Sequence, residues 1–136
     1  MNFIRIITVT LLGFLSLSGA AQNLIGYNAR QIIQIMKDKE KSMNFQKFTN
    51  NSTFKYLKYV DDNDSQTLLF FLTADSICKA VRLICDKNLK QQKIKEFNNI
   101  YKTNGVNVWT DKRNGKKYII ELKDEDVSLT INIKSK

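Results

Sequence analysis

Hydrophobic residues recur along the chain with two different periods, and the first pattern has the period of a helix. It begins behind Asn28, a residue type that caps helix starts, and we expect this helix to end near Lys41. Its apolar members are Ala29, Ile32, Ile33 and Met36. A second helix is predicted over residues 87–102, followed by Gly105, a residue common just beyond a helix end. Its inward-facing residues are Leu89, Ile94, Phe97, Ile100 and Tyr101.

Elsewhere the hydrophobic period falls to two, which is typical of strands. Asn114-Gly115 is a strong hairpin signal, because type I′ turns need a positive φ at both central residues. The apolar spacing of residues 77–85 also fits a helix, but their β-branched content favours a strand. The predicted strands cover residues 45–49, 54–61, 68–72, 77–85, 106–111, 116–123 and 127–134.

The order of these elements predicts an α+β fold, with the order α-β-β-β-β-α-β-β-β. Strands joined by short turns pair antiparallel, and a sheet buries one face against other elements. We therefore expect one domain over residues 22–136, in which two helices pack on one face of a curved antiparallel sheet.

Residues 1–21 have the three parts of a cleaved export signal: a positive charge at Arg5, an apolar run over residues 6–17 and small residues over 18–21. Gly19 and Ala21 take the −3 and −1 places if cleavage precedes Gln22. The apolar run is shorter than the roughly 20 residues that span a bilayer. We expect a periplasmic or secreted protein with no transmembrane segment in the mature chain.

Charge narrows the classes of partner. The chain has 22 Lys and Arg, and loss of Arg5 leaves 21 against 13 Asp and Glu, a net charge of +8. This excess favours anionic lipid, glycan or acidic protein, although the lysines are scattered along the sequence. No nucleic-acid-binding motif is present. The chain has no His, which removes the usual general base and the commonest zinc ligand, and we expect no metal or cofactor.

Two other groups of residues could form a disulfide or a cation-binding loop. Cys78 and Cys85 would lie roughly 23 Å apart on opposite faces of a straight strand, so we expect free, buried thiols; a disulfide would need a sharp bend. The acidic segment 61–65 could suggest a calcium-binding loop. An EF-hand loop starting at Asp61 would need Gly and Glu where Gln66 and Leu72 stand, so we predict that this segment is a solvated turn.

Tyr59, Phe71 and Trp109 are the candidate binding residues. Trp109 alternates with Val106 and Val108, so we expect it on the face away from the hydrophobic core, together with Tyr59 and Phe71. Exposed aromatics on an open sheet face are typical of recognition surfaces; a loop or a second copy in a homodimer is the alternative cover. A basic side of the second helix is the other candidate, either an ordinary solvated face or a contact for an anionic surface: Lys87, Lys90, Lys93 and Lys95.

Helix followed by antiparallel strands, twice over behind an export signal, resembles the modules of β-lactamase-inhibitor-like proteins and of BamE-like outer-membrane assembly lipoproteins. The opening Gly26-Tyr27-Asn28-Ala29 is similar to the start of such modules. The resemblance implies an exported binding domain.

Three functions follow from the sequence. The leading hypothesis is an exported module without catalytic activity that binds an envelope or secreted protein through its uncovered sheet face. The second is a basic surface protein that binds anionic lipid or glycan. The third is a cofactor-free hydrolase, since carboxylate pairs meet in space rather than along the chain.

The predicted export signal can be tested by the amino terminus of the exported protein. Mass spectrometry of the exported protein should place its amino terminus at or within a few residues of Gln22. A mature chain that still carries residues 6–17 would contradict the predicted location.

Overall fold

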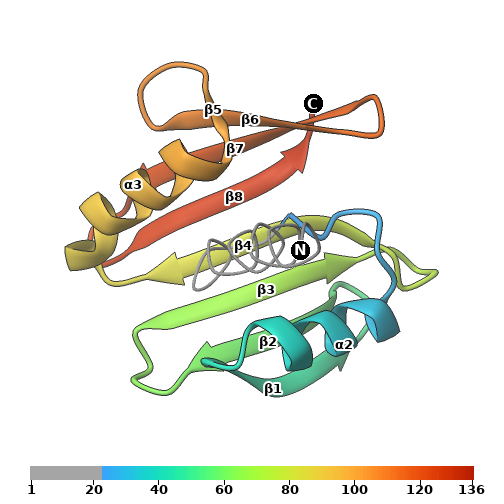
Figure 1. Ribbon diagram of the computed structural model, residues 1–136. Coiled ribbons are helices and arrows are strands. Elements are labelled where there is room, and N and C mark those ends of the chain that lie inside the picture. Colours follow the sequence, from blue (N-terminus) through green and yellow to red (C-terminus); the bar gives the residue numbers. More distant parts are fainter. Residues whose placement is uncertain (1–22) are drawn as a thin grey trace, which may run out of the picture.

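The computed structural model describes residues 23–136 (Figure 1), so the predicted export signal lies outside the described residues. Two helices, α2 (Ala29–Lys39) and α3 (Lys90–Ile100), accompany one eight-stranded sheet, and a 3-10 turn, η1 (Lys87–Leu89), precedes α3. The strands are β1 (Met43–Asn50), β2 (Lys55–Asp61), β3 (Gln66–Leu72), β4 (Cys78–Cys85), β5 (Lys102–Thr103), β6 (Val108–Arg113), β7 (Lys116–Asp124) and β8 (Leu129–Ser135).

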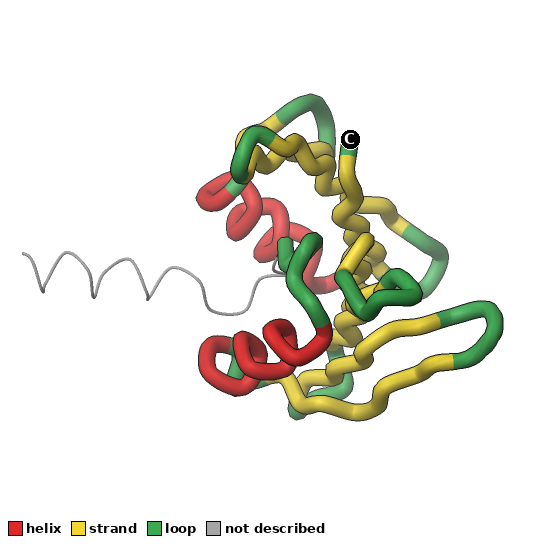
Figure 2. The backbone as a smooth tube through the Cα atoms, turned by 90° about the vertical axis from the view of Figure 1, so that its right-hand side faces the viewer, coloured by secondary structure: helices red, strands yellow, loops and turns green. Residues whose placement is uncertain are grey.

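All neighbouring strands are antiparallel, in the order β1-β2-β3-β4-β8-β7-β6-β5. Both helices lie on the same face of the sheet, α2 toward the β1 end and α3 toward the β5 end (Figures 1 and 2). The α+β class and the covering of one face by two helices are therefore confirmed. Within the described residues, the predicted order lacks the two-residue strand β5 and the 3-10 turn η1, whose residues were predicted as the start of the second helix.

The start of α2 follows the predicted chemistry. Asn28 and Gln31 form a reciprocal capping box, in which each side chain accepts from the other's backbone N–H at 2.9 Å. Ile32 and Met36 are buried against the sheet, whereas Ile33 is largely exposed. The apolar stripe of α2 is therefore narrower than its sequence spacing predicts.

Residues 78–85 form a strand, and a β-bulge changes the direction of its first side chain. Leu72 pairs with Cys78 and Phe71 pairs with Ala80, which leaves Lys79 as the extra residue. Cys78 therefore turns to the helix-covered face, the face that Cys85 also occupies. The prediction of opposite faces was wrong because it assumed a regular strand, but both cysteines are free and buried.

The chain segment before α2 lies on the sheet between the two helices (Figure 2). The N–H of Gly26 donates to the carbonyl of Cys78, and the N–H of Cys78 donates to the carbonyl of Tyr27, both at 2.9 Å. Leu24 and Ile25 are buried in the core here. These six residues, 23–28, therefore act as a third covering element beside the helices.

Trp109 belongs to the core rather than to the open face. Its indole is 2% exposed, lies 5.2 Å from the Phe97 ring of α3 and donates to Asn98 Oδ1 at 2.9 Å. The prediction failed because Val106, taken as an inward residue, lies in a turn and is 89% exposed. The side chains of β6 do alternate between the two faces, but Trp109 points to the core, opposite to the predicted direction.

Burial of Trp109 predicts its spectroscopy and its contribution to stability. Its fluorescence should be blue-shifted and weakly quenched by acrylamide in the native protein. Trp109→Ala should lower the free energy of unfolding by about 3–5 kcal/mol, measured by urea denaturation, because it opens a core cavity and leaves Asn98 without its donor. Thr110→Ala on the opposite face is the matched control. A cost under about 1 kcal/mol for Trp109→Ala would contradict this packing.

The two thiols give a pH-dependent prediction. Burial raises the pKa of Cys78 from 9.0 to about 12 and that of Cys85 from 9.0 to about 11. The neutral thiols are favoured in the folded state, so their stabilisation is complete below pH 9, falls as the pH rises above 9 and is lost once the pH has passed 11 to 12. Between pH 9 and pH 11, the free energy of unfolding of a Cys78→Ala, Cys85→Ala double variant should fall by less than that of the wild type.

Alkylation provides the measurement of the thiols themselves. Native protein at pH 8 should react slowly with iodoacetamide, and denatured, unreduced protein should titrate two free thiols. Denatured protein without a reactive thiol would contradict the free state of these cysteines.

Candidate functional site: the open sheet face around Phe71

The face of the sheet opposite the helices is not covered by any described element (Figure 2). The strand register fixes which side chains stand there, because directly paired residues point to the same side. One row of partners runs across the sheet through Thr49, Tyr56, Phe71, Ala80, Lys134, Ile119 and Thr110. The next row runs through Lys47, Lys58, Leu69, Arg82, Asn132, Glu121 and Val108.

Phe71 lies at the centre of an aromatic and cationic cluster on this face. Its ring is 5.9 Å from that of Tyr56 in an edge-on arrangement, and the Arg82 guanidinium lies 5.5 Å from the Phe71 centroid. Arg82 Nε donates to Asn132 Oδ1 at 2.8 Å, which fixes the guanidinium over the ring. The cluster therefore offers an ordered aromatic surface with a positive charge held above it.

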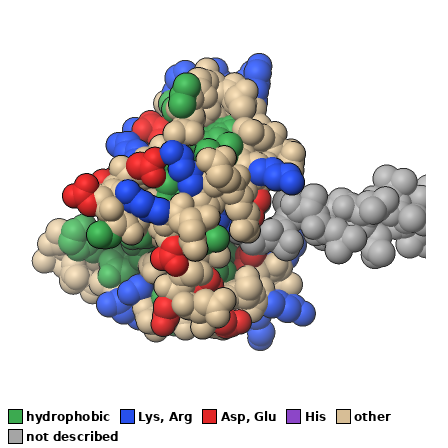
Figure 3. All heavy atoms as spheres, turned by 90° about the vertical axis from the view of Figure 1, so that its left-hand side faces the viewer, with side chains coloured by type: hydrophobic (Ala, Val, Ile, Leu, Met, Phe, Trp, Pro, Cys, Tyr) green, Lys and Arg blue, Asp and Glu red, His purple; other side chains and the backbone are tan. Residues whose placement is uncertain are grey.

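Two hollows adjoin Phe71. One, of about 380 Å³, lies between Phe71 and the turn that carries Phe54, and Lys79 also lines it. The other, of about 280 Å³, extends over β4 and β8 beside Arg82 and Lys134. Figure 3 shows hydrophobic side chains gathered at its left-hand edge, on the side away from the helices, with Lys and Arg side chains above and below them.

Charge on the open face is almost entirely positive. Its cationic side chains are Lys47, Lys58, Arg82, Lys112, Lys117, Lys123 and Lys134. Among the paired positions described for this face, the only carboxylate is that of Glu121, which lies 3.5 Å from Lys134 Nζ. Lysines that are scattered along the sequence are thus gathered in space, because strand alternation places them on one side of the sheet. The alternation of lysines with apolar residues within each strand is the sequence signal that could have predicted this gathering.

The three predicted aromatic residues do not meet. Phe71 stands on the open face as expected. Tyr59, like Trp109, lies on the helix-covered face, where it is 3% exposed. Its ring packs edge-on between Phe45 at 5.6 Å and Phe70 at 5.9 Å. Tyr59 is buried because it pairs with Leu68, a core position of β3. Tyr56, which the sequence did not single out, takes its place beside Phe71.

The predicted basic side of the second helix does not form as a single patch. Lys93 is 1% exposed, and its Nζ lies 3.3 Å from Glu96 Oε2. Lys90 Nζ lies 2.6 Å from Asp124 Oδ2, and its hydrogen bond lowers the pKa of that carboxyl. Only Lys87 and Lys95 of the four remain exposed without such a contact. Helical periodicity alone did not reveal that the Lys93 stem is long enough to be buried beside Phe97.

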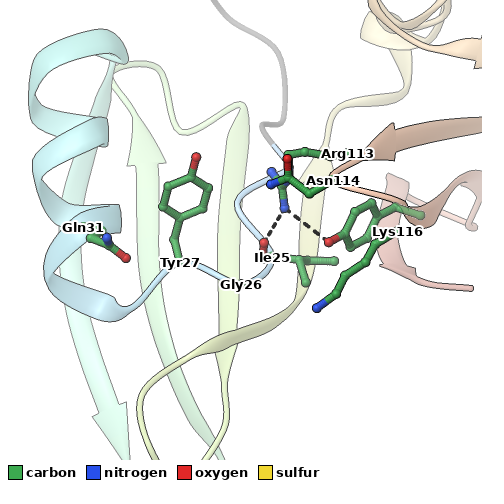
Figure 4. Close-up of a pocket in the computed structure, with 8 residues that line it drawn as sticks. Ile25, Gly26, Tyr27, Gln31, Arg113, Asn114 and Lys116 are labelled. Carbon is green, nitrogen blue, oxygen red and sulfur yellow. Dashed lines mark hydrogen bonds between the residues drawn. The ribbon is translucent and has the colours of Figure 1, made fainter.

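A third hollow, of about 290 Å³, lies near the start of the described chain and is lined by Gly26, Tyr27, Arg113 and Lys116 among others (Figure 4). The Arg113 guanidinium donates to the carbonyls of Asn23, at 2.6 Å, and Ile25. It also stacks 5.1 Å from the Tyr118 ring and 5.5 Å from the Tyr27 ring. These contacts hold the segment 23–28 on the sheet, so Arg113 has a structural role.

The acidic turn after β2 also has a structural role. Asp61 accepts from the Ser65 hydroxyl and from the N–H of Gln66, and Asp62 accepts from Asn44 Nδ2 at 2.6 Å. Within residues 23–136, no group of three or more His, Cys, Asp or Glu side chains could hold a metal ion. None of the helices in the same range is long and apolar enough to cross a membrane.

The open face also lacks the pair of carboxylates that glycoside hydrolysis uses, since Glu121 stands alone among its paired positions. No family model, curated protein or solved structure matches the chain.

Proposed function

We propose that this protein is an exported binding module and that its open sheet face binds an acidic surface of a partner protein. The observation that carries the proposal is the composition of that face: an aromatic centre of Tyr56 and Phe71 under Arg82, with cations around it and Glu121 as its one paired-position carboxylate.

This arrangement matches the anatomy of protein interfaces. Interface centres are enriched in aromatic residues and Arg, and the few residues that contribute most affinity are anchors of these types. Around such a centre, cations accelerate encounter with an acidic partner and select against basic ones. The two hollows beside Phe71 give the surface the relief that partner side chains fill.

Anionic lipid or glycan is the second candidate, and the cations of the open face favour it. The two candidates differ in what they require of Phe71. A polyanion needs the charges alone, whereas a protein partner also needs the aromatic centre to be covered. Loss of the Phe71 ring should therefore weaken protein binding strongly and polyanion binding little.

Site-directed photocrosslinking in cells that export the protein tests this proposal. A photoreactive residue at Lys58 on the open face should give a protein adduct, and one at Gln91 on the exposed side of α3 should not. Phe71→Ala should weaken the interaction by about tenfold or more, as expected for an interface anchor. Because Phe71 is only partly buried, the variant should lose about 1 kcal/mol of stability.

Defined polyanions provide the comparison. If heparin or phosphatidylglycerol vesicles bind the wild type and Phe71→Ala equally, and no adduct forms at position 58, the second candidate replaces the first. Equal adducts at positions 58 and 91 would contradict the assignment of the open face.

A further inference from the structure

A separate groove lies on the opposite side of the molecule, between the second half of α2 and the beginning of the edge strand β1. Its volume of about 480 Å³ falls within the range of roughly 300–1,000 Å³ typical of small-molecule sites. Its lining is mainly apolar with charged residues among it: Ile33, Met36, Lys37, Glu40, Lys41, Met43, Asn44, Phe45 and Tyr59.

Tyr59 lines this groove and carries a buried hydroxyl. The residue is 3% exposed, and within the described chain its hydroxyl is buried without a hydrogen-bond partner. A buried, unpaired hydroxyl costs free energy comparable to a lost hydrogen bond. Burial also raises the pKa of this phenol to about 12, so at neutral pH it remains a hydrogen-bond donor. The hydroxyl is therefore suited to an acceptor supplied by a ligand.

The walls of the groove are apolar and accessible. Ile33 on α2 is 42% exposed and Phe45 on β1 is 51% exposed, although both are large hydrophobic side chains. Phe45 also packs against the Tyr59 ring, so the apolar wall continues to the tyrosine. An aliphatic chain laid along these residues would remove apolar surface from water.

The exposed charges at the groove are positive. Lys37 and Lys41 are both exposed, whereas Glu40 is buried at the end of α2. The two ammonium groups are therefore the charges that a ligand entering from solvent meets first. Charge complementarity favours an anionic head group at this rim.

We propose that this groove binds an acylated anion, a molecule with an aliphatic chain, a carbonyl next to it and an anionic head group. The chain lies along Ile33 and Phe45, the carbonyl oxygen accepts from the Tyr59 hydroxyl, and the head group meets Lys37 and Lys41. The groove is formed by α2, β1 and β2, so the proposal does not depend on the open face around Phe71.

N-octanoylglycine, below its micelle concentration, is the probe. Isothermal titration calorimetry with the mature protein should show saturable binding of one molecule. N-octanoylethanolamine has the same chain and carbonyl but a neutral head group, and it should bind at least fivefold more weakly. Equal binding of the two, or no saturable binding of N-octanoylglycine, would overturn the proposal.

Variants assign the contacts. Tyr59→Phe removes only the hydroxyl and should weaken binding roughly three- to tenfold, the effect of one hydrogen bond. Its midpoint of urea denaturation should stay equal or rise, because the buried unpaired group is gone. A Lys37→Gln, Lys41→Gln variant should abolish the preference for N-octanoylglycine over its ethanolamine analogue.

The matched controls lie on the open face. Lys134→Gln and Phe71→Ala should bind N-octanoylglycine like the wild type, which separates this site from the proposed protein interface. Tyr59→Phe protein that binds with unchanged affinity would overturn the assignment of the hydroxyl, and loss of binding in Lys134→Gln would overturn the location.

Discussion

Eight strands expose more apolar surface on one face than two short helices can cover. Neighbouring strands lie about 4.8 Å apart, so the sheet is roughly 34 Å wide, whereas two helices with their side chains cover roughly 20–24 Å. The remaining gap lies between α2 and α3, and the extended segment 23–28 fills it. Leu24 and Ile25 supply the apolar contacts there, and Arg113 holds the segment by its backbone carbonyls. Burial of the central strands depends on this third cover.

The same alternation that buries one face organises charge on the other. Inward positions of the central strands are taken by large aliphatic and aromatic residues, so the charged residues of those strands point to the open face or lie at strand ends. Several carboxylates stand at strand ends or in turns, where Asp61 and Asp62 accept hydrogen bonds and Asp124 pairs with Lys90 beside α3. The net positive charge of the protein is therefore concentrated on the open face.

Local periodicity predicted the two helices, the succession of helices and strands along the chain and the covering of one face, because these depend on spacing within each segment. It could not supply the phase of β6, where Val106 belongs to a turn and the sequence has no second apolar residue to mark the inward side. The bulge at Cys78 and the burial of Tyr59 depend on partner strands, which single-segment patterns do not contain. The clustering of cations around Phe71 is likewise a property of register across seven strands. Arg113 reaches residues 88 and 90 positions away, a contact that no short-range pattern reveals.

The position of the segment 23–28 has a consequence for the order of folding. The first described residues bind Cys78 on β4, and they also bind Asp111 and Arg113 on β6 through hydrogen bonds between residues 88 and 90 positions apart. Loop closure of this length carries a large entropic cost, and folding slows as native contacts become more distant in sequence. We therefore expect the amino-terminal end of the domain to dock late in folding, after β6 is in place. We expect the centre of the sheet to stay open to water until this segment docks, so that residues 23–28 and β6 become ordered together.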